Sequence, residues 1–394
     1  MNNGLVTRRN FLKAGGIGSV LVAGGVVWRS SENGVFSTGE GAAYEPWASW
    51  RTDKSEGPLG LVRSAILAAN PHNSQPWQFR IIESRIDLFA DTTRNIGAID
   101  PRRREMHTGL GCALENLLLT AGAEGYHYQL QLMPDATDMT HVARIDLSSG
   151  NRSESELFQA IPRRHTNRGP YDKLREVSSE ILESLQGLTR DLPGVSILWF
   201  KTEEEKRKLS GLIVEATEAI IADREQSDDS SKWMRMTQRE LQEHRDGLTL
   251  DAMGFPWYVR AAAKFFPPLS REKSDEAWLQ ATKDTHVATA SAFGLVCVGD
   301  VENPVERLKG GRFYQRMHLW ATNQSLGMHP LSQMTERADR ERSLVIEPRF
   351  GNELKKLTDD HGPQILMIFR IGHPLREALP SPRRAIKEVI ANSD

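Results

Sequence analysis

The chain has 394 residues, 39% of them hydrophobic and 26% charged, so we expect a folded body of two ordinary domains or one large one. Lys and Arg number 50 against 52 Asp and Glu, and the formal net charge of -2 excludes a global basic field that would hold nucleic acid or an anionic membrane. Only two cysteines occur, which excludes a disulfide framework and a cysteine-rich metal site. Cys112 and Cys297 stand in apolar runs and are interpreted as core residues, with a single disulfide as the alternative.

The N-terminal segment has the pattern of an export signal. Residues 7–13 read Thr-Arg-Arg-Asn-Phe-Leu-Lys and precede an apolar, Gly-rich stretch over 14–28. Paired arginines before a short apolar run are typical of the twin-arginine route, whose export machinery would be a partner. The run is shorter than the roughly 20 residues that span a bilayer. We expect 1–45 to be a signal and linker and the protein to be periplasmic or otherwise exported, with an uncleaved signal as a possible anchor; the alternative is a plain basic segment.

Strand-like and helix-like patterns then follow one another. The expected elements of the first part are a helix over 61–70, strands over 77–82 and 86–90, a helix over 107–124, and strands over 128–133 and 141–147. The later part echoes this order with a helix over 178–187, a strand over 195–200, a helix over 311–326 and a strand over 364–371. Each long helix is followed by a glycine, Gly125 or Gly327. The order predicts an α+β fold with a weak internal duplication.

Residues 202–285 separate these two parts and are highly charged. Amphipathic helices are expected over 203–225 and 232–244. The pattern breaks over 246–268, where aromatic residues cluster. Two interpretations remain open: a flap that closes over a flat ligand, or a helical hairpin packed on the core.

Several common catalytic motifs are absent from the sequence. It contains no P-loop, no His-Glu-x-x-His or paired-cysteine zinc motif, and no Gly-x-Ser-x-Gly motif. Gly109-Leu-Gly111 lacks the third glycine and the preceding strand of a dinucleotide fingerprint, so close helix packing explains it better. Simple hydrolase and zinc-enzyme interpretations therefore lack support.

Three short polar segments remain. In the first, two prolines stiffen the run Asn70-Pro71-His72-Asn73-Ser74-Gln75-Pro76-Trp77, whose amides suit the polar edge of a heterocycle. In the second, Arg164, Thr166 and Arg168 alternate along an extended stretch, so they share one face that suits a phosphate. The third, Pro380-Ser-Pro-Arg-Arg384, follows the last strand and could close the same pocket. The alternatives are a tight turn, a solvated basic loop and a basic tail.

Together the three segments resemble motifs of the flavin nitroreductase superfamily. The loop 71–77 is similar to that family's flavin-contacting loop, and 164–168 to its phosphate and ribityl motif, with Thr166 in place of Ser. Residues 327–332 resemble the segment whose backbone faces the reactive flavin nitrogen, and the terminal arginines resemble phosphate contacts. The cofactor site implied by the resemblance consists of Pro71, His72, Asn73, Ser74, Gln75, Arg164, Thr166, Arg168, Pro330, Leu331, Ser332, Arg383 and Arg384.

The order of the motifs departs from ordinary homodimeric members, in which the arginine motif comes first. Here the loop comes first and is not repeated, an order similar to the single-chain Acg-like branch. The resemblance implies a monomeric pseudo-dimer of two nitroreductase-like halves, 46–150 and 151–394, with a helical lid over about 202–285 and one site per chain.

The resemblance also implies a function. One bound flavin mononucleotide (FMN) would pass two electrons from a reductant such as NAD(P)H to a small acceptor, a nitroaromatic or a quinone. The flavin would carry the chemistry, so no catalytic side chain and no metal are named. Two alternatives stay open: a non-catalytic protein that sequesters or stores FMN, and a cofactor-free exported interaction protein.

Overall fold

The computed structural model describes residues 32–52, 57–358 and 362–391. The twin-arginine motif and the apolar stretch 14–28 lie outside the described residues, so the export signal stays a prediction. No helix in the described ranges is both long and apolar enough to cross a membrane. The two cysteines are free and buried, as their apolar surroundings predicted.

The first half of the chain forms a four-stranded antiparallel sheet. Its order is β1 (Trp77–Ile82), β2 (Arg85–Ala90), β4 (His141–Ser149) and β3 (Tyr126–Leu132). Trp77 and Phe79 of β1 are buried, while Gln78 and Arg80, which alternate with them, are exposed. This alternation is what a strand with one solvated face requires, and the predicted strands are confirmed within a few residues.

The second half forms a second antiparallel sheet with the same plan. Its order is β5 (Ser196–Phe200), β8 (Ala292–Val298), β10 (Gln364–Gly372) and β9 (Gly327–Pro330). In each sheet the chain runs from the edge strand to its neighbour, enters a long helix, forms the opposite edge strand and returns to the middle. The weak duplication seen in the sequence is thus a shared strand order, and the α+β class is confirmed.

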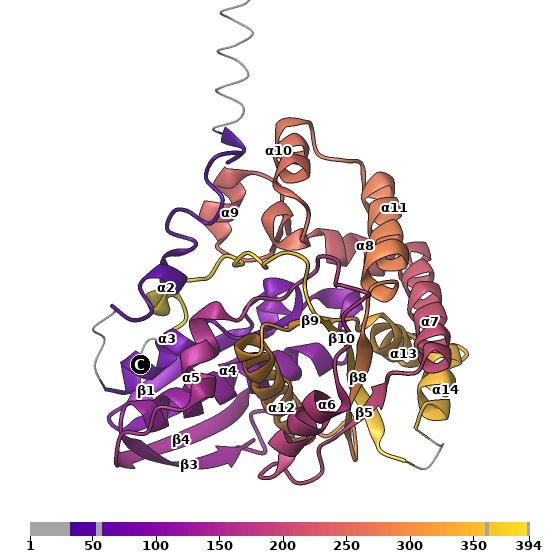
Figure 1. The fold of residues 1–394 in the computed structure, drawn as a ribbon. Coiled ribbons are helices and arrows are strands. Elements are labelled where there is room, and N and C mark those ends of the chain that lie inside the picture. Colours follow the sequence, from indigo (N-terminus) through magenta and orange to yellow (C-terminus); the bar gives the residue numbers. More distant parts are fainter. Residues whose placement is uncertain (1–31, 53–56, 359–361, 392–394) are drawn as a thin grey trace, which may run out of the picture.

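Two long helices lie side by side between the sheets (Figure 1): α4 (Arg104–Ala123) and α12 (Pro304–Asn323). A Cβ atom on Gly111 would stand 2.2 Å from the carbonyl oxygen of Leu308, and one on Gly311 would stand 2.1 Å from that of Thr108. Only glycine allows these backbones to approach so closely. The packing interpretation of Gly109-Leu-Gly111 is therefore confirmed.

Shorter helices surround this core: α2 (Glu45–Ala48), α3 (Pro58–Ala65), α5 (Glu156–Ala160), α6 (Ser179–Gln186), α13 (Gln333–Leu344) and α14 (Arg349–Lys356). Some expected bounds were wrong. The helix expected over 61–70 is α3 and ends at Ala65, and the one expected over 311–326 is α12, which begins at Pro304. Gly327 does not end α12 but begins β9; Ser325, with a φ of 56°, makes the turn instead.

The insertion 202–285 forms the upper part of the molecule in Figure 1. It contains α7 (Glu203–Ala222), α8 (Arg224–Ser231), α9 (Gln238–His244), α10 (Trp257–Phe265), α11 (Arg271–Ala281) and the short parallel pair β6 (Met234–Arg235) and β7 (Leu248–Thr249). The expectation of irregular structure over 246–268 was wrong, because α10 lies within it. Its aromatic residues Trp257 and Tyr258 face water and so mark no apolar stripe toward the core.

The C-terminal segment returns from the second sheet to the first. The Phe79 N–H donates to the Val389 carbonyl at 2.8 Å, and the Ala391 N–H donates to the Phe79 carbonyl at 2.8 Å. These bonds extend β1 by a short parallel bridge. On the way the segment crosses the loop that precedes β1, which brings the terminal arginines beside residues 70–76.

Candidate functional site

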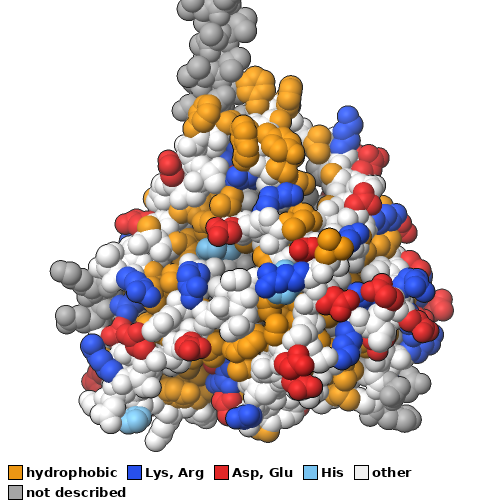
Figure 2. Space-filling view, in the orientation of Figure 1, with side chains coloured by type: hydrophobic (Ala, Val, Ile, Leu, Met, Phe, Trp, Pro, Cys, Tyr) orange, Lys and Arg blue, Asp and Glu red, His pale blue; other side chains and the backbone are white. Residues whose placement is uncertain are grey.

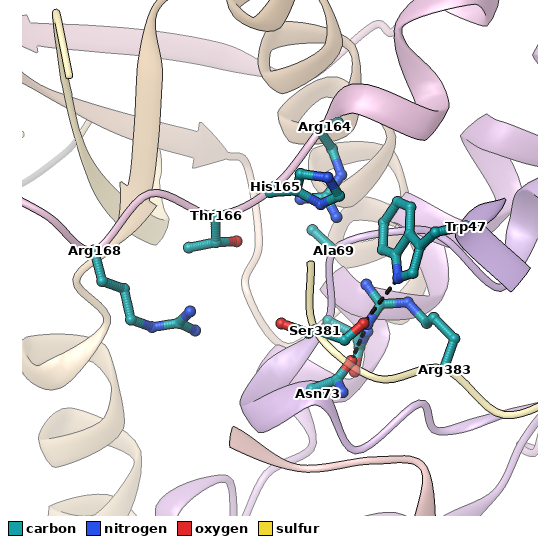
Figure 3. A pocket seen from close by; sticks show the side chains of 10 residues that line it. Trp47, Ala69, Asn73, Arg164, His165, Thr166, Arg168, Ser381 and Arg383 are labelled. Carbon is teal, nitrogen blue, oxygen red and sulfur yellow. Dashed lines mark hydrogen bonds between the residues drawn. The ribbon is translucent and has the colours of Figure 1, made fainter. Parts of the chain in front are cut away.

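The three polar segments singled out from the sequence meet around one recess (Figure 3). The empty space in it, counted together with the part open to solvent, is about 310 Å³. It is lined by Trp47, Ala69, Asn70, Asn73, Arg164, His165, Thr166, Arg168, Ser381 and Arg383. The predicted closure of a pocket by the arginine motif and the C-terminal segment agrees with this arrangement.

The loop before β1 has a strained backbone. His72, Asn73 and Gln75 have φ angles of 46°, 54° and 53°, in the left-handed region that residues other than glycine rarely adopt. Each such residue costs on the order of 1 kcal/mol or more and persists only when its surroundings enforce it. Part of that enforcement is the Asn70 Oδ1 atom, which accepts the Gln75 N–H at 2.8 Å. The strain is concentrated where the loop meets the recess.

The side chains of this loop join the C-terminal segment to the insertion. The Asn73 amide donates to the carbonyl of Pro382 at 2.9 Å and to that of Gly247 at 3.1 Å. The Gln75 amide donates to the Arg245 carbonyl at 2.8 Å, and its oxygen accepts the Arg384 N–H at 2.9 Å. Since these amide groups are engaged with backbone, their main contribution in this structure is to fix the walls of the recess.

Arg164 and Arg383 are buried in the recess, with exposed fractions of 2% and 3%. Arg164 donates to the Leu67 carbonyl at 3.2 Å, and Arg383 donates to the Ala68 carbonyl at 3.1 Å and to the Asn73 side chain. The Nε atom of each arginine is buried without a hydrogen-bond partner. Within the described ranges no carboxylate forms an ion pair with either residue.

Arg168 faces the same recess from its other side (Figure 3) and donates to the Ala252 carbonyl of the insertion at 3.3 Å. Burial lowers the pKa of Arg164 and of Arg168 to about 10, and it lowers that of Arg383 as well. Burial, followed by the charges of Arg164 and Arg383, lowers the pKa of His165 to about 3. At neutral pH the histidine is uncharged and the recess carries a net positive charge, which suits a multiply charged anion.

Sequence reasoning missed several residues of this site. The Trp47 indole donates to the Ser381 carbonyl at 2.8 Å, and its ring lies 4.9 Å from the Arg383 guanidinium. Arg370 of β10 is fully buried and donates to the Gly169 carbonyl at 2.8 Å, which fixes the backbone beside Arg168. No spacing in the sequence connects these residues to the recess, because the elements that carry them meet only in the folded chain.

Other predicted site residues lie outside the lining of the recess. The Leu331 N–H, expected to address the flavin, donates to the Ile368 carbonyl at 2.8 Å. The Arg384 side chain bonds to the carbonyls of Gln75 and Glu388. The remaining residues outside the lining are Pro71, His72, Ser74, Gln75, Pro330 and Ser332. Their roles stay predictions.

No family model matches the chain. Among curated proteins, it is 32% identical over 116 residues to a Mycobacterium tuberculosis protein named "Putative NAD(P)H nitroreductase acg", and 29% identical over 113 residues to another named "Putative NAD(P)H nitroreductase Rv3131". Over this part of its length the chain is similar to Acg-like putative nitroreductases. Each match covers 28% of this chain and about a third of the relative, 34% and 33% respectively. The resemblance drawn from the motifs is confirmed.

Solved structures similar to this chain include nitroreductases. The FMN- and NADPH-dependent nitroreductase NfnB from a Sphingopyxis strain is 15% identical, with a TM-score of 0.38 over 60% of this chain and 99% of that one. A nitroreductase with bound FMN from Bacteroides fragilis is 12% identical, with a TM-score of 0.37 over 61% of this chain and all of the other.

Proposed function

We propose that this chain binds one FMN and works as a nitroreductase-like oxidoreductase, passing two electrons from a reductant such as NAD(P)H to a small nitroaromatic or quinone. The observation that carries the proposal is the recess of Arg164, Arg168 and Arg383, which holds three cations without a carboxylate partner among the described residues. Burying unpaired charge is costly, so such a set is selected for binding an anion.

The residues present fit the phosphate end of FMN. Arg164, Thr166 and Arg383 line the same recess and together offer guanidinium and hydroxyl donors to phosphate oxygens, and the Nε atom of each arginine has no hydrogen-bond partner. The lining of the recess is polar and cationic, which suits an anion better than an apolar ligand, and its uncharged histidine leaves the positive charge to the arginines. The phosphate would be held by Arg164, Thr166 and Arg383, and Arg168 would lie toward the ribityl chain.

When bound, the flavin would supply the hydride chemistry. The contribution of this chain is binding and orientation. Arg168 would place positive charge beside the cofactor, and the strained loop with Trp47 would fix one wall of its site. We also propose that the shared strand order of the two sheets reflects two fused nitroreductase-like halves, which would make the protein a monomeric pseudo-dimer, and that it acts after twin-arginine export.

The first experiment is an absorbance spectrum of the purified full-length protein, incubated with FMN and washed, then recorded anaerobically before and after addition of NADPH. The expected result is a bound flavin spectrum that bleaches. A bound flavin that is not reduced by NADPH or by a chemical reductant able to enter the site would favour FMN storage. Absence of bound flavin would contradict the proposal and favour the cofactor-free interaction protein.

A matched pair of variants assigns the binding to the recess. Arg164→Gln removes a buried cation, whereas Arg163→Gln removes its exposed neighbour. We expect Arg164→Gln to weaken FMN binding by about tenfold to a hundredfold, since a charge-assisted hydrogen bond contributes about 1.5–3 kcal/mol. Arg163→Gln should bind as the wild type does. Equal affinity of both variants for FMN would show that the recess does not bind the cofactor.

A further inference from the structure

Helix α10 has its polar and apolar faces reversed. Its one buried residue is Lys264, whereas Trp257 and Tyr258 are 73% and 60% exposed. Phe266, directly after the helix, is 63% exposed. A surface helix of a globular protein normally turns its apolar stripe to the core and its charges to water. The aromatic side chains of α10 therefore need another explanation than core packing.

An ion-pair cluster enforces this reversal. Asp251, which is 4% exposed, accepts from the Lys264 ammonium at 2.6 Å and from the Arg260 guanidinium at 2.9 Å. These contacts hold the charged side of α10 against the body of the insertion, so the opposite side points outward. Residues 252–271 contain no Asp or Glu. The aromatic surface is thus free of acidic groups from its own segment.

The exposed side chains form one apical aromatic patch, which we define as Phe36, Phe255, Trp257, Tyr258, Phe266 and Leu269. Figure 2 shows apolar side chains gathered at the apex of the insertion, beside the place where the described chain begins. The patch lies on the far side of the insertion from the sheets (Figure 1). Large exposed apolar surfaces of this kind mark sites of interaction with another protein or a membrane.

The beginning of the described chain is fixed to this patch. The Asn33 amide donates to the Lys264 carbonyl at 2.7 Å, and the Lys264 ammonium donates to the Gly34 carbonyl at 2.9 Å. The described chain therefore begins at the same apex as the aromatic residues, and the sequence that precedes it includes the apolar stretch 14–28. Its length, below that needed to span a bilayer, suits attachment to one face of a membrane.

We propose that the apical aromatic patch docks on a lipid bilayer and lies in its interfacial region. Trp and Tyr are the residues that favour this region, because each combines an apolar ring with a polar group. The net charge of -2 provides no global attraction to anionic lipid, so the attraction comes from burial of the aromatic rings. Docking should therefore persist on uncharged lipid and at high salt. This inference is independent of the proposed cofactor.

The test is cosedimentation of the full-length protein with vesicles of phosphatidylcholine alone and of phosphatidylethanolamine with phosphatidylglycerol. The patch variant is Trp257→Ser, Tyr258→Ser and Phe266→Ser. The control variant removes three exposed apolar residues elsewhere, Leu174→Ser, Val345→Ser and Leu375→Ser. We expect the patch variant to bind both kinds of vesicle at least about tenfold more weakly, as loss of apolar burial requires, and the control variant to bind normally.

A second measurement reports the position of the patch directly. Cys112 and Cys297 are buried, so a Trp257→Cys variant can be labelled selectively with an environment-sensitive dye, with Leu174→Cys as control. Vesicles should shift the dye emission to the blue at position 257 and leave it unchanged at 174. No shift at 257, or equal vesicle binding by the patch and control variants, would overturn the proposal. So would a wild-type dimer that the patch variant converts to monomer without a change in vesicle binding.

Discussion

Two regions of this molecule treat arginines that are largely shielded from water in opposite ways. Around α13, Arg104 pairs with Asp339 at 2.5 Å, and Arg337 and Arg340 pair with Asp223 at 3.1 Å and 2.9 Å. In the recess, Arg164, Arg168 and Arg383 donate only to neutral groups among the described residues. The first region neutralises its charge inside the chain, whereas the second leaves its charge for an external anion.

Structural arginines and anion-binding arginines differ in the partners of their guanidinium groups. Both sets are desolvated, so burial alone does not distinguish them. A structural arginine either has its donors taken up by neutral acceptors, as Arg370 does with backbone carbonyls and Thr289, or has a carboxylate in contact, as Arg104 does, because an uncompensated buried charge is costly. A binding arginine can lack one because its partner arrives from solution. Removal of one partner of a pair, titration of a buried acid and addition of an anion each test whether the two sets of arginines differ in this way.

The largest effect is expected from breaking the internal pair. Asp339→Asn leaves Arg104 buried without a counter-charge, which should lower the free energy of unfolding by about 3–5 kcal/mol in urea titrations. Glu215→Gln breaks the exposed pair with Arg349 and serves as control, with a change within about 1 kcal/mol. Similar losses in both variants would show that burial of the pair at Asp339 is of no consequence.

The second effect concerns Glu105, which stands next to Arg104 in sequence. Burial, and then the charge of Asp100, raises the pKa of Glu105 from 4.5 to about 7. The folded state thus binds a proton more tightly than the unfolded state, and stability is lost as pH rises from about 4.5 to 7. At about 1.4 kcal/mol per pKa unit, the loss is roughly 3 kcal/mol.

The measurement is the unfolding free energy of Glu105→Gln minus that of the wild type at pH 5 and at pH 8. This difference in unfolding free energy should increase by roughly 3 kcal/mol as the pH rises. Taking a difference is necessary because buried histidines such as His72 and His107, whose pKa is lowered to about 4 by burial, titrate in the opposite sense. A difference that stays constant with pH would show that Glu105 is ionised at low pH in the folded protein.

The smallest effect is stabilisation by inorganic phosphate, the simplest anion for the recess. At 100 times its Kd, phosphate should stabilise the wild type by about 2.7 kcal/mol, seen as a higher Tm. Arg383→Gln should lose most of this gain at the same concentration. Arg384→Gln should keep most of it, because Arg384 bonds to backbone outside the recess. Equal losses would support the sequence assignment of both arginines to the phosphate.

Much of the fold could be predicted because its signals are local. Buried and exposed residues alternate in β1, β2 has a run of mostly apolar residues, and turn residues flank both strands. Helix α4 is rich in apolar residues along its length. Helix α13 was missed for the opposite reason. Its sequence Gln-Met-Thr-Glu-Arg-Ala-Asp-Arg-Glu-Arg-Ser-Leu has almost no apolar stripe, yet Arg337, Asp339 and Glu341 are buried. Ion pairs with distant elements replace the apolar contacts that a pattern search would find.

The sequence by itself determined the chemistry of the site: the arginine alternation at 164–168, the terminal arginines and the stiff loop at 70–76. These are short-range patterns, and their side chains keep their character wherever the fold places them. Only the tertiary structure decided which of them share a recess. In the folded chain Arg383 and Trp47 line the recess and Arg384 does not, and α10 has its charged side buried and its aromatic residues exposed. These outcomes depend on contacts between segments far apart in the chain, such as Arg383 with Asn73 and Lys264 with Gly34.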